Sequence, residues 1–492
     1  DGEVITNPLE IKLQGLLALT GNPVSDQLHP MKGPMTTQTL RGMVNSGAMH
    51  WRGDRSVGVF GTDATDSTLS FNNFNVAFPG LVGRNSVLSS AEMNAYTAFA
   101  LTITLPPNPI RDLDNSLTTS QQAGHDFFTG SRRSDGLPFD ITGNQDGFSC
   151  NGCHELDPSQ GFFGTGRTAS FENETQIFKV AHLRNMYQKV GMFGMPNISF
   201  FNSGDNTHMG DQVRGTGFLH DGSTDTMFRF FNATVFNSGF GDTVGFPSNQ
   251  AQAQQARADM EQFMFAFDTD LAPITGQQIT LDSNSSSEVD ARIDLLLARA
   301  AAPFVSKVLG GNVTEVNVVA SGYIDGAARG FVRLADGTFQ SDDPNELPIS
   351  AATLRGLINT PDESLTFTAV PPGSGERIGI DRDSDGFYNG IDVCPTIADA
   401  NQTDDDNDGR GNACDNCLVV SNPLQRDTNG DGFGNFCDAD LNNDNNVNSL
   451  DLGLFKQRFF TTDPDADLNG DGIVNSLDLG LFKQMFFLPP GP

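Results

Sequence analysis

The feature that most constrains this chain is an acidic C-terminal segment in which one loop pattern recurs in register. Residues 381–492 contain 21 Asp, no Glu and six Lys or Arg, so their net charge is −15 (6 minus 21). A segment of this kind stays disordered unless something neutralises it. We therefore expect a divalent cation to organise the segment.

Five loops in this segment place Asp or Asn at positions 1, 3, 5, 9 and 12. Position 6 is Gly in four of them and Asn445 in the other, and both residue types tolerate a positive φ. Hard oxygen ligands at alternate positions predict about five Ca²⁺ loops, although position 12 is Asp where an EF-hand has Glu. A solvated acidic linker is the alternative. The predicted ligands are Asp381, Asp383, Asp385, Asn389, Asp392, Asp404, Asp406, Asp408, Asn412, Asp415, Asp427, Asn429, Asp431, Asn435, Asp438, Asp440, Asn442, Asp444, Asn448, Asp451, Asp467, Asn469, Asp471, Asn475 and Asp478.

The first three loops carry four cysteines with equal spacing. Disulfides Cys394–Cys414 and Cys417–Cys437 would use all four, which agrees with an oxidising compartment. The run DNCLVVSNPLQRDTNGDGFGNFCD resembles a thrombospondin type 3 repeat. The resemblance implies that this part of the chain wraps around Ca²⁺ ions with little hydrophobic core.

The last two loops belong to an internal repeat, DLNNDNNVNSLDLGLFKQRFF (440–460) and DLNGDGIVNSLDLGLFKQMFF (467–487). Each loop runs into an amphipathic segment, for which we predict a short helix. This duplication resembles a type I dockerin, and the resemblance implies a cohesin-like partner for residues 439–492. The alternative is a calcium-stabilised cap that binds nothing. The residues that would recognise the partner are Ser449, Leu450, Ser476 and Leu477.

The run Cys150-Asn151-Gly152-Cys153-His154 has the C-x-x-C-H spacing at which c-type haem is attached. Two thiols at this spacing add to the two vinyl groups of one porphyrin, and the following histidine ligates the iron. A redox dithiol needs no following His, and a zinc site needs a second Cys/His pair, which the neighbouring sequence lacks. The motif predicts one haem c per chain and, since attachment occurs outside the bacterial cytoplasm, an exported protein: extracellular, cell-surface or periplasmic.

The sequence predicts a multidomain chain with a mainly α cytochrome c body, a small α+β module and a calcium-loop tail with short helices. Helical patterns cover 91–101, 120–128 and 251–268. An alternating pattern with a turn at Asp336-Gly337 predicts a β-meander, and helical segments flank it.

Segments of the body resemble the di-haem cytochrome c peroxidases and their MauG-like relatives over about residues 1–275. These segments are HPMKGPMTTQTLRG followed by MHWRGDR, FKVAHLRN, and FLHDGSTDT. The resemblance implies that His29 is the distal ligand of a peroxidatic haem and that Trp51 lies between two haems. It also implies that Arg184 meets a haem propionate, for which a guanidinium is a natural partner, and that His220 lies near the haem without ligating it. A catalytic role for His29 or Trp51 rests on this resemblance alone.

The chain departs from that family at its haem ligands. No Cys precedes His29, so the family's N-terminal haem is either lost or carried by an upstream segment. Thr234 stands where the family has its Met or Tyr ligand. The sixth iron ligand is therefore open, and an empty position is one alternative. The candidates are Met192 or Met195, and also Met227, His182 and His208.

The expected domains are a remnant of the peroxidase-like N-terminal domain (1–120), the haem domain (121–275), the α+β module (276–375), the thrombospondin-like repeats (376–438) and the dockerin-like repeat (439–492). The whole chain has 29 Lys and Arg against 61 Asp and Glu, a net charge of −32. This balance argues against binding to nucleic acid or anionic lipid, because both need clustered cations. No run of 18 apolar residues is present, so we expect no transmembrane segment.

Three functions fit these features. The first is an exported cytochrome that passes single electrons to a redox partner protein and is attached through its tail. The second is a peroxidase-like or MauG-like oxidoreductase, which needs an open iron position and a nearby acid/base group. The third is a structural or cell-surface assembly protein. We favour electron transfer, because the missing haem motif argues against catalytic competence.

Overall fold

The computed structural model of the chain divides into two compact units, residues 1–276 with 298–316 and residues 277–297 with 317–492. No described helix combines the length and the apolar character that a bilayer crossing requires. The structure describes residues 66–132, 134, 149–165, 180–191, 215–219, 222, 224–233, 236–238, 242 and 244–491, and scattered positions between 36 and 63.

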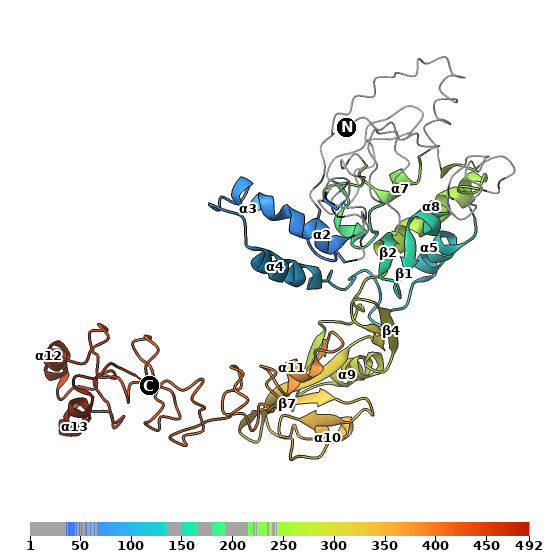
Figure 1. The fold of residues 1–492 in the computed structure, drawn as a ribbon. Coiled ribbons are helices and arrows are strands. Elements are labelled where there is room, and N and C mark those ends of the chain that lie inside the picture. The colour runs from blue at the N-terminus through green and yellow to red at the C-terminus, as the bar shows by residue number, and fades with distance from the viewer. Residues whose placement is uncertain are drawn as a thin grey trace. The chain divides into compact units, whose positions relative to one another are not determined.

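The described part of the first unit consists of helices and two-stranded antiparallel sheets, β1–β2 and β4–β5 (Figure 1). Capping boxes set the starts of two helices, from Ser89 and Glu92 for α4 and from Thr118 and Gln121 for α5. The elements are α2 (Ser67–Asn72), η1 (Asn73–Val76), α3 (Ala77–Gly80), α4 (Ser90–Thr102), α5 (Thr119–Thr129), α6 (Cys150–Cys153), β1 (Glu155–Asp157), β2 (Phe162–Thr165), η3 (Met186–Gln188), α7 (Met227–Phe230), α8 (Gln250–Phe265), β4 (Pro303–Ser306) and β5 (Gly311–Thr314). The three helices predicted from the sequence are thus confirmed as α4, α5 and α8, and hairpins accompany them.

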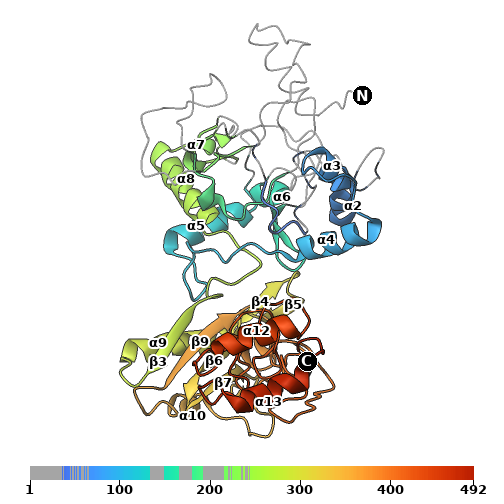
Figure 2. The ribbon, with the colours of Figure 1, turned by 90° about the vertical axis from the view of Figure 1, so that its left-hand side faces the viewer.

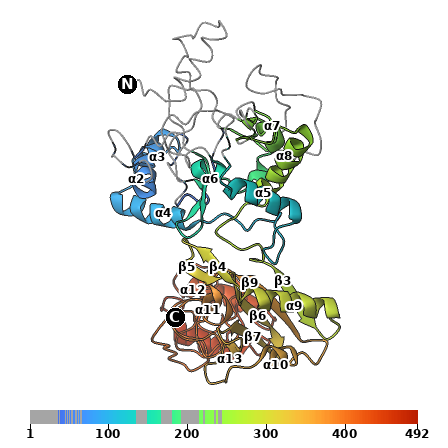
Figure 3. The ribbon, with the colours of Figure 1, turned by 90° about the vertical axis from the view of Figure 1, so that its right-hand side faces the viewer.

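Helix α5 packs against α8 in this unit (Figure 3). The two helices approach closely at Gly124, where a Cβ would lie 2.2 Å from the carbonyl oxygen of Asp259. Phenylalanine rings fill the space beside this contact, with Phe128 centred 5.6 Å from Phe263 and 5.5 Å from Phe267. Because Cys150 packs against the same apolar cluster, this core also positions the start of the candidate haem motif.

The second unit begins with a five-stranded antiparallel sheet in the order β3-β9-β6-β7-β8 (Figure 2). The turn between β6 and β7 has Asp325 and Gly326 at positive φ, and Gly337 has a positive φ in the next turn. Arg355 bonds the carboxylates of Asp290 and Asp294, which joins α10 to α9. The predicted β-meander with flanking helices is confirmed. The elements are β3 (Gln278–Asp282), α9 (Ser287–Arg299), β6 (Asn317–Ile324), β7 (Ala327–Arg333), β8 (Phe339–Ser341), α10 (Ala351–Arg355), β9 (Ser364–Val370) and α11 (Gly375–Gly379).

The sheet and the first acidic loop share an apolar cluster. Ile380, which is fully buried, packs with Val319, Val332 and Val370, and Tyr388 of the loop packs against them. The remaining tail is irregular until α12 (Ser449–Arg458) and α13 (Ser476–Met485), which pack together through Phe455 and Phe482 with ring centroids 5.2 Å apart. The tail therefore has apolar anchors at its two ends and acidic loops between them.

Candidate functional site

Helix α6 and the β1–β2 hairpin hold His154 in one orientation. The hydroxyl of Ser149 accepts from Gly152 N at 2.9 Å and caps α6, and His154 N donates to Cys150 O at 2.7 Å. The hairpin then brings the carbonyl oxygen of Gly164 within 3.0 Å of His154 Nδ1. A carbonyl can only accept, so Nδ1 carries the proton and Nε2 keeps the lone pair that a metal needs.

Glycine at position 164 is required by this geometry. Its φ is +82°, and a Cβ there would lie 2.5 Å from Leu183 Cγ. A larger residue would therefore displace the carbonyl that orients His154. Burial lowers the pKa of His154, which favours the neutral imidazole. Hydrogen bonding of the remote ring nitrogen to a carbonyl is the usual support for a metal-binding histidine.

Cys153 and His154 line a cavity of about 1100 Å³ within the first unit. Part of its wall is apolar, with Leu183, Met186, Phe218, Met227 and Phe230. The described disulfides do not include Cys150 or Cys153. Burial, followed by the neighbouring Cys153, raises the pKa of Cys150 to about 12, which argues against a reactive redox dithiol.

Arg184 lies at the cavity wall but is held by a buried ion pair. Its Nη1 donates to Asp270 at 2.6 Å, and its Nη2 donates to Gly42 O and Ser46 Oγ at 2.8 Å each. The side chains of Arg184 and Asp270 are each 1% exposed. The guanidinium also stacks over Phe163, with 5.0 Å from Cζ to the ring centroid. The predicted propionate partner thus already has a carboxylate partner from the protein.

The other predicted body residues divide into two groups. Trp51, His182 and Met227 line the same cavity as His154, and Trp51 Nε1 donates to Thr36 O at 2.9 Å. The structure therefore brings these residues together with the haem motif. His29, Met192, Met195, His208, His220 and Thr234 lie outside the described residues.

The acidic loops of the second unit share one hydrogen-bond pattern. The first carboxylate of a loop accepts from the backbone of positions 4 and 6: Asp381 accepts from Ser384 N at 2.7 Å and Gly386 N at 3.1 Å. Asp404, Asp427, Asp440 and Asp467 accept in the same way from the residue at position 6. These bonds close each loop around its own carboxylates, as a cation site requires.

Carboxylates from several positions converge within the first two loops. Asp381, Asp383 and Asp385 offer oxygens that all lie within 4.8 Å of one another, and so do Asp404, Asp406 and Asp408. Burial and neighbouring carboxylates raise the pKa of Asp383 and of Asp406. A bound cation would relieve this repulsion, so the arrangement suits Ca²⁺.

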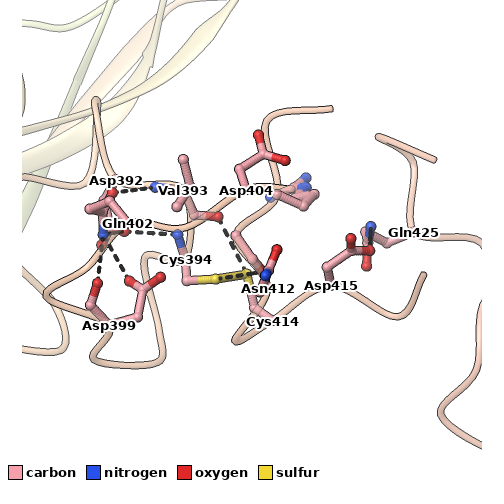
Figure 4. Close-up of a disulfide and its surroundings, with 12 residues drawn as sticks. Asp392, Val393, Cys394, Asp399, Gln402, Asp404, Asn412, Cys414, Asp415 and Gln425 are labelled. Atoms are coloured by element: carbon pink, nitrogen blue, oxygen red, sulfur yellow. Dashed lines mark hydrogen bonds between the residues drawn. A yellow bond between two sulfur atoms is a disulfide. The ribbon is translucent and has the colours of Figure 1, made fainter. Parts of the chain in front are cut away.

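A glutamine joins each disulfide to its loop, and sequence reasoning missed it (Figure 4). Gln402 accepts from Val393 N at 3.0 Å and donates to Asp392 at 2.9 Å and Asp399 at 2.7 Å. Gln425 donates to Asp415 at 2.8 Å, in the place equivalent to the bond between Gln402 and Asp392. Asp399 adds a carboxylate that groups with Asp385 and Asp392 within 4.8 Å. The recurrence of Gln 23 residues apart was the available signal.

The predicted disulfides Cys394–Cys414 and Cys417–Cys437 are confirmed.

In the last two loops the Asp at position 12 also caps the following helix, because it completes a capping box with the Asn at position 9. Asp451 accepts from Asn448 N at 2.9 Å, and Asp478 accepts from Asn475 N at 2.8 Å. The loop therefore sets the first turn of α12 or α13. The amide oxygens of Asn448 and Asn475 accept backbone N–H groups of these helices.

Comparison with known families agrees with the geometry of the tail. Residues 438–487 match the family model of the dockerin type I domain, and residues 380–402 match that of the thrombospondin type 3 repeat. Calcium binding by the tail and its two repeat types are supported by these matches and by the acidic clusters. No curated protein and no solved structure matches the chain.

Proposed function

We propose that this chain is an exported, calcium-stabilised protein whose body carries one haem c for electron transfer. Its tail attaches the body to a cohesin-bearing partner. The observation that carries the haem assignment is the hydrogen bond from His154 Nδ1 to the Gly164 carbonyl, which places the ring proton on Nδ1, in a histidine that lines a cavity. The observation that carries the attachment is the dockerin match over 438–487.

Two residues of the C-x-x-C-H motif, Cys153 and His154, line the cavity, and Cys150 lies on the same helical turn, α6. Cys150 and Cys153 would bind the vinyl groups, and His154 would bind the iron through Nε2. When bound, the haem supplies a one-electron couple between ferrous and ferric iron. Met186 and Met227 are buried at the cavity wall, so this part of the proposed haem environment is apolar.

In this proposal the tail binds the partner through its last two loops and the helices α12 and α13. Leu450 and Leu477 are 64% and 63% exposed at equivalent positions of α12 and α13. Exposed leucines on a helix held by a calcium loop form a surface that a protein partner can cover. This surface supports recognition at Ser449/Leu450 and Ser476/Leu477.

The test is the haem content of the full chain made in a host that attaches c-type haem. The expected result is one haem per chain by pyridine haemochrome absorbance, and its loss when Cys150 and Cys153 are both replaced by Ser. A chain that matures without covalent haem would refute the body assignment and leave the tail assignment intact.

The optical and EPR spectra of the same sample separate electron transfer from peroxidase-like catalysis. Low-spin iron supports the electron carrier, because both axial positions are then filled. High-spin iron that reacts with peroxide would favour the peroxidase-like alternative, for which His182 at the cavity wall is a candidate acid/base group.

A further inference from the structure

The side chains that line the cavity of Cys153 and His154 differ in charge from the acidic chain as a whole. Asp and Glu number 61 in the whole sequence, yet none of the described lining residues is acidic. Three of the described lining residues are basic: Arg41, Arg184 and Lys189. Together with the apolar wall, this lining suits an apolar ligand that carries carboxylates.

The three cations differ in whether they are available to such a ligand. Arg184 is already paired with Asp270 and bonded to Gly42 and Ser46. Arg41 is exposed to solvent, where an ion pair is worth little. Lys189 is partly buried, and no described carboxylate pairs with it at ion-pair distance.

Lys189 lines the same cavity as the proposed iron ligand, His154. Burial and the charge of Arg184 lower the pKa of Lys189 to about 8. A partly buried ammonium that no described carboxylate pairs with favours an anionic ligand beside it.

We infer that Lys189, and not Arg184, supplies the protein cation that pairs with a haem propionate in this cavity. The inference rests on the proposed haem site and assigns one residue toward it. Arg184 then acts structurally, since its ion pair with Asp270 joins the segment after β2 to the segment after α8. Lys189 is a positioning residue that also tunes the reduction potential, because a cation beside a propionate offsets its negative charge near the iron.

The experiment compares the reduction potentials of three haem-loaded full-length variants with that of the unchanged chain, by optical redox titration. Lys189→Gln removes the charge, Lys189→Arg keeps it, and Lys307→Gln removes an exposed lysine charge from the same unit as a matched control. We expect a lower potential in Lys189→Gln alone, because an uncompensated propionate stabilises ferric iron. Lys189→Arg keeps the comparison valid even if Lys189→Gln matures poorly.

Two results would overturn the inference. One is a potential in Lys189→Gln equal to that of Lys307→Gln. The other is a change of iron spin state in both Lys189 variants, which would make the lysine amine an iron ligand. Failure of the proposed function itself is distinct, because it appears as the absence of a haemochrome in the unchanged chain and overturns both.

Discussion

Different kinds of interaction stabilise the body and the tail of this protein. In the body, rings such as Phe263 and Phe267 are fully buried, and the buried charges of Arg184 and Asp270 neutralise each other. In the tail between Asp381 and Asp438, the residues that converge are carboxylates, and the structure around them consists of turns. The hydrophobic effect stabilises the packed rings of the first region, whereas the second region needs a cation.

Because of this difference, we expect the two regions to unfold under different conditions. The stability of an apolar core does not depend on chelators, but it falls when buried side chains are truncated. The stability of carboxylate loops changes little when surface side chains are truncated, but it falls when the metal is removed.

Removal of calcium has the largest expected effect. EDTA should unfold residues 381–487, because their converging carboxylates then repel one another without compensation. Hydrogen exchange followed by mass spectrometry should show loss of protection in the tail, while the haem absorption spectrum stays unchanged. Return of Ca²⁺ is the control. A haem spectrum that collapsed with EDTA would contradict the independence of the two regions.

Breaking the buried ion pair in the body has the next largest effect. Arg184→Met leaves the Asp270 carboxylate uncompensated at 1% exposure and should lower the free energy of unfolding of the body by about 3–5 kcal/mol. Urea unfolding measures this change. The double variant Arg184→Met/Asp270→Asn should recover part of the loss, and calcium affinity should not change in either.

Ile380 lies where the apolar core of the sheet meets the first acidic loop, so its replacement tests both regions. Ile380→Ala should lower the stability of the sheet by about 3 kcal/mol, because this residue packs with Val319, Val332 and Val370. It should also weaken calcium binding to the loop that begins at Asp381. The measurement is urea unfolding with and without Ca²⁺. Equal losses in both conditions would show that the first loop and the sheet are not coupled.

The glutamine bridges are expected to contribute less. Gln402→Ala removes bonds to Val393 N, Asp392 and Asp399, and should cost about 1–2 kcal/mol in the calcium-loaded tail. Thermal unfolding of the loaded chain reports this. Gln425→Ala is the matched variant in the next loop, and the two costs should be similar. A neutral result at both sites would mean that the metal and the disulfides alone hold the loops.

Replacing the exposed leucines should have the smallest effect on stability. Leu450→Ala with Leu477→Ala should change the free energy of unfolding by less than about 0.5 kcal/mol, since both side chains are mostly exposed. Calcium-dependent binding to a cohesin domain, measured by calorimetry, should nevertheless fall. Undiminished binding would place the contact surface elsewhere on the tail.

The tail was predictable from sequence because its determinants are local. Asp381, Asp383 and Asp385 lie within five residues, and the same spacing recurs at each loop. The disulfides join cysteines 20 residues apart, and the capping of α12 by Asn448 and Asp451 is equally local. Local patterns of this kind specify local structure directly.

The body was less predictable because its determinants are distant in sequence. The partner of Arg184 is Asp270, which lies 86 residues away, and nothing near either residue indicates the pairing. Because the sequence does not indicate this ion pair, it favoured Arg184 as the partner of a propionate and suggested no role for Lys189. Asp399 was overlooked for a similar reason, since it lies outside the 12-residue loop whose carboxylates it joins.

The short span of the tail disulfides has a consequence for how this protein matures. Cys394–Cys414 and Cys417–Cys437 each close a segment of 20 residues, and a short loop costs little entropy to close. Each tail cysteine therefore meets its correct partner with little loss of chain entropy. Cys150 and Cys153 are left out of these disulfides. The proposed haem attachment requires these two thiols to stay reduced while the four tail cysteines are oxidised, so the proposal requires one compartment to supply both conditions.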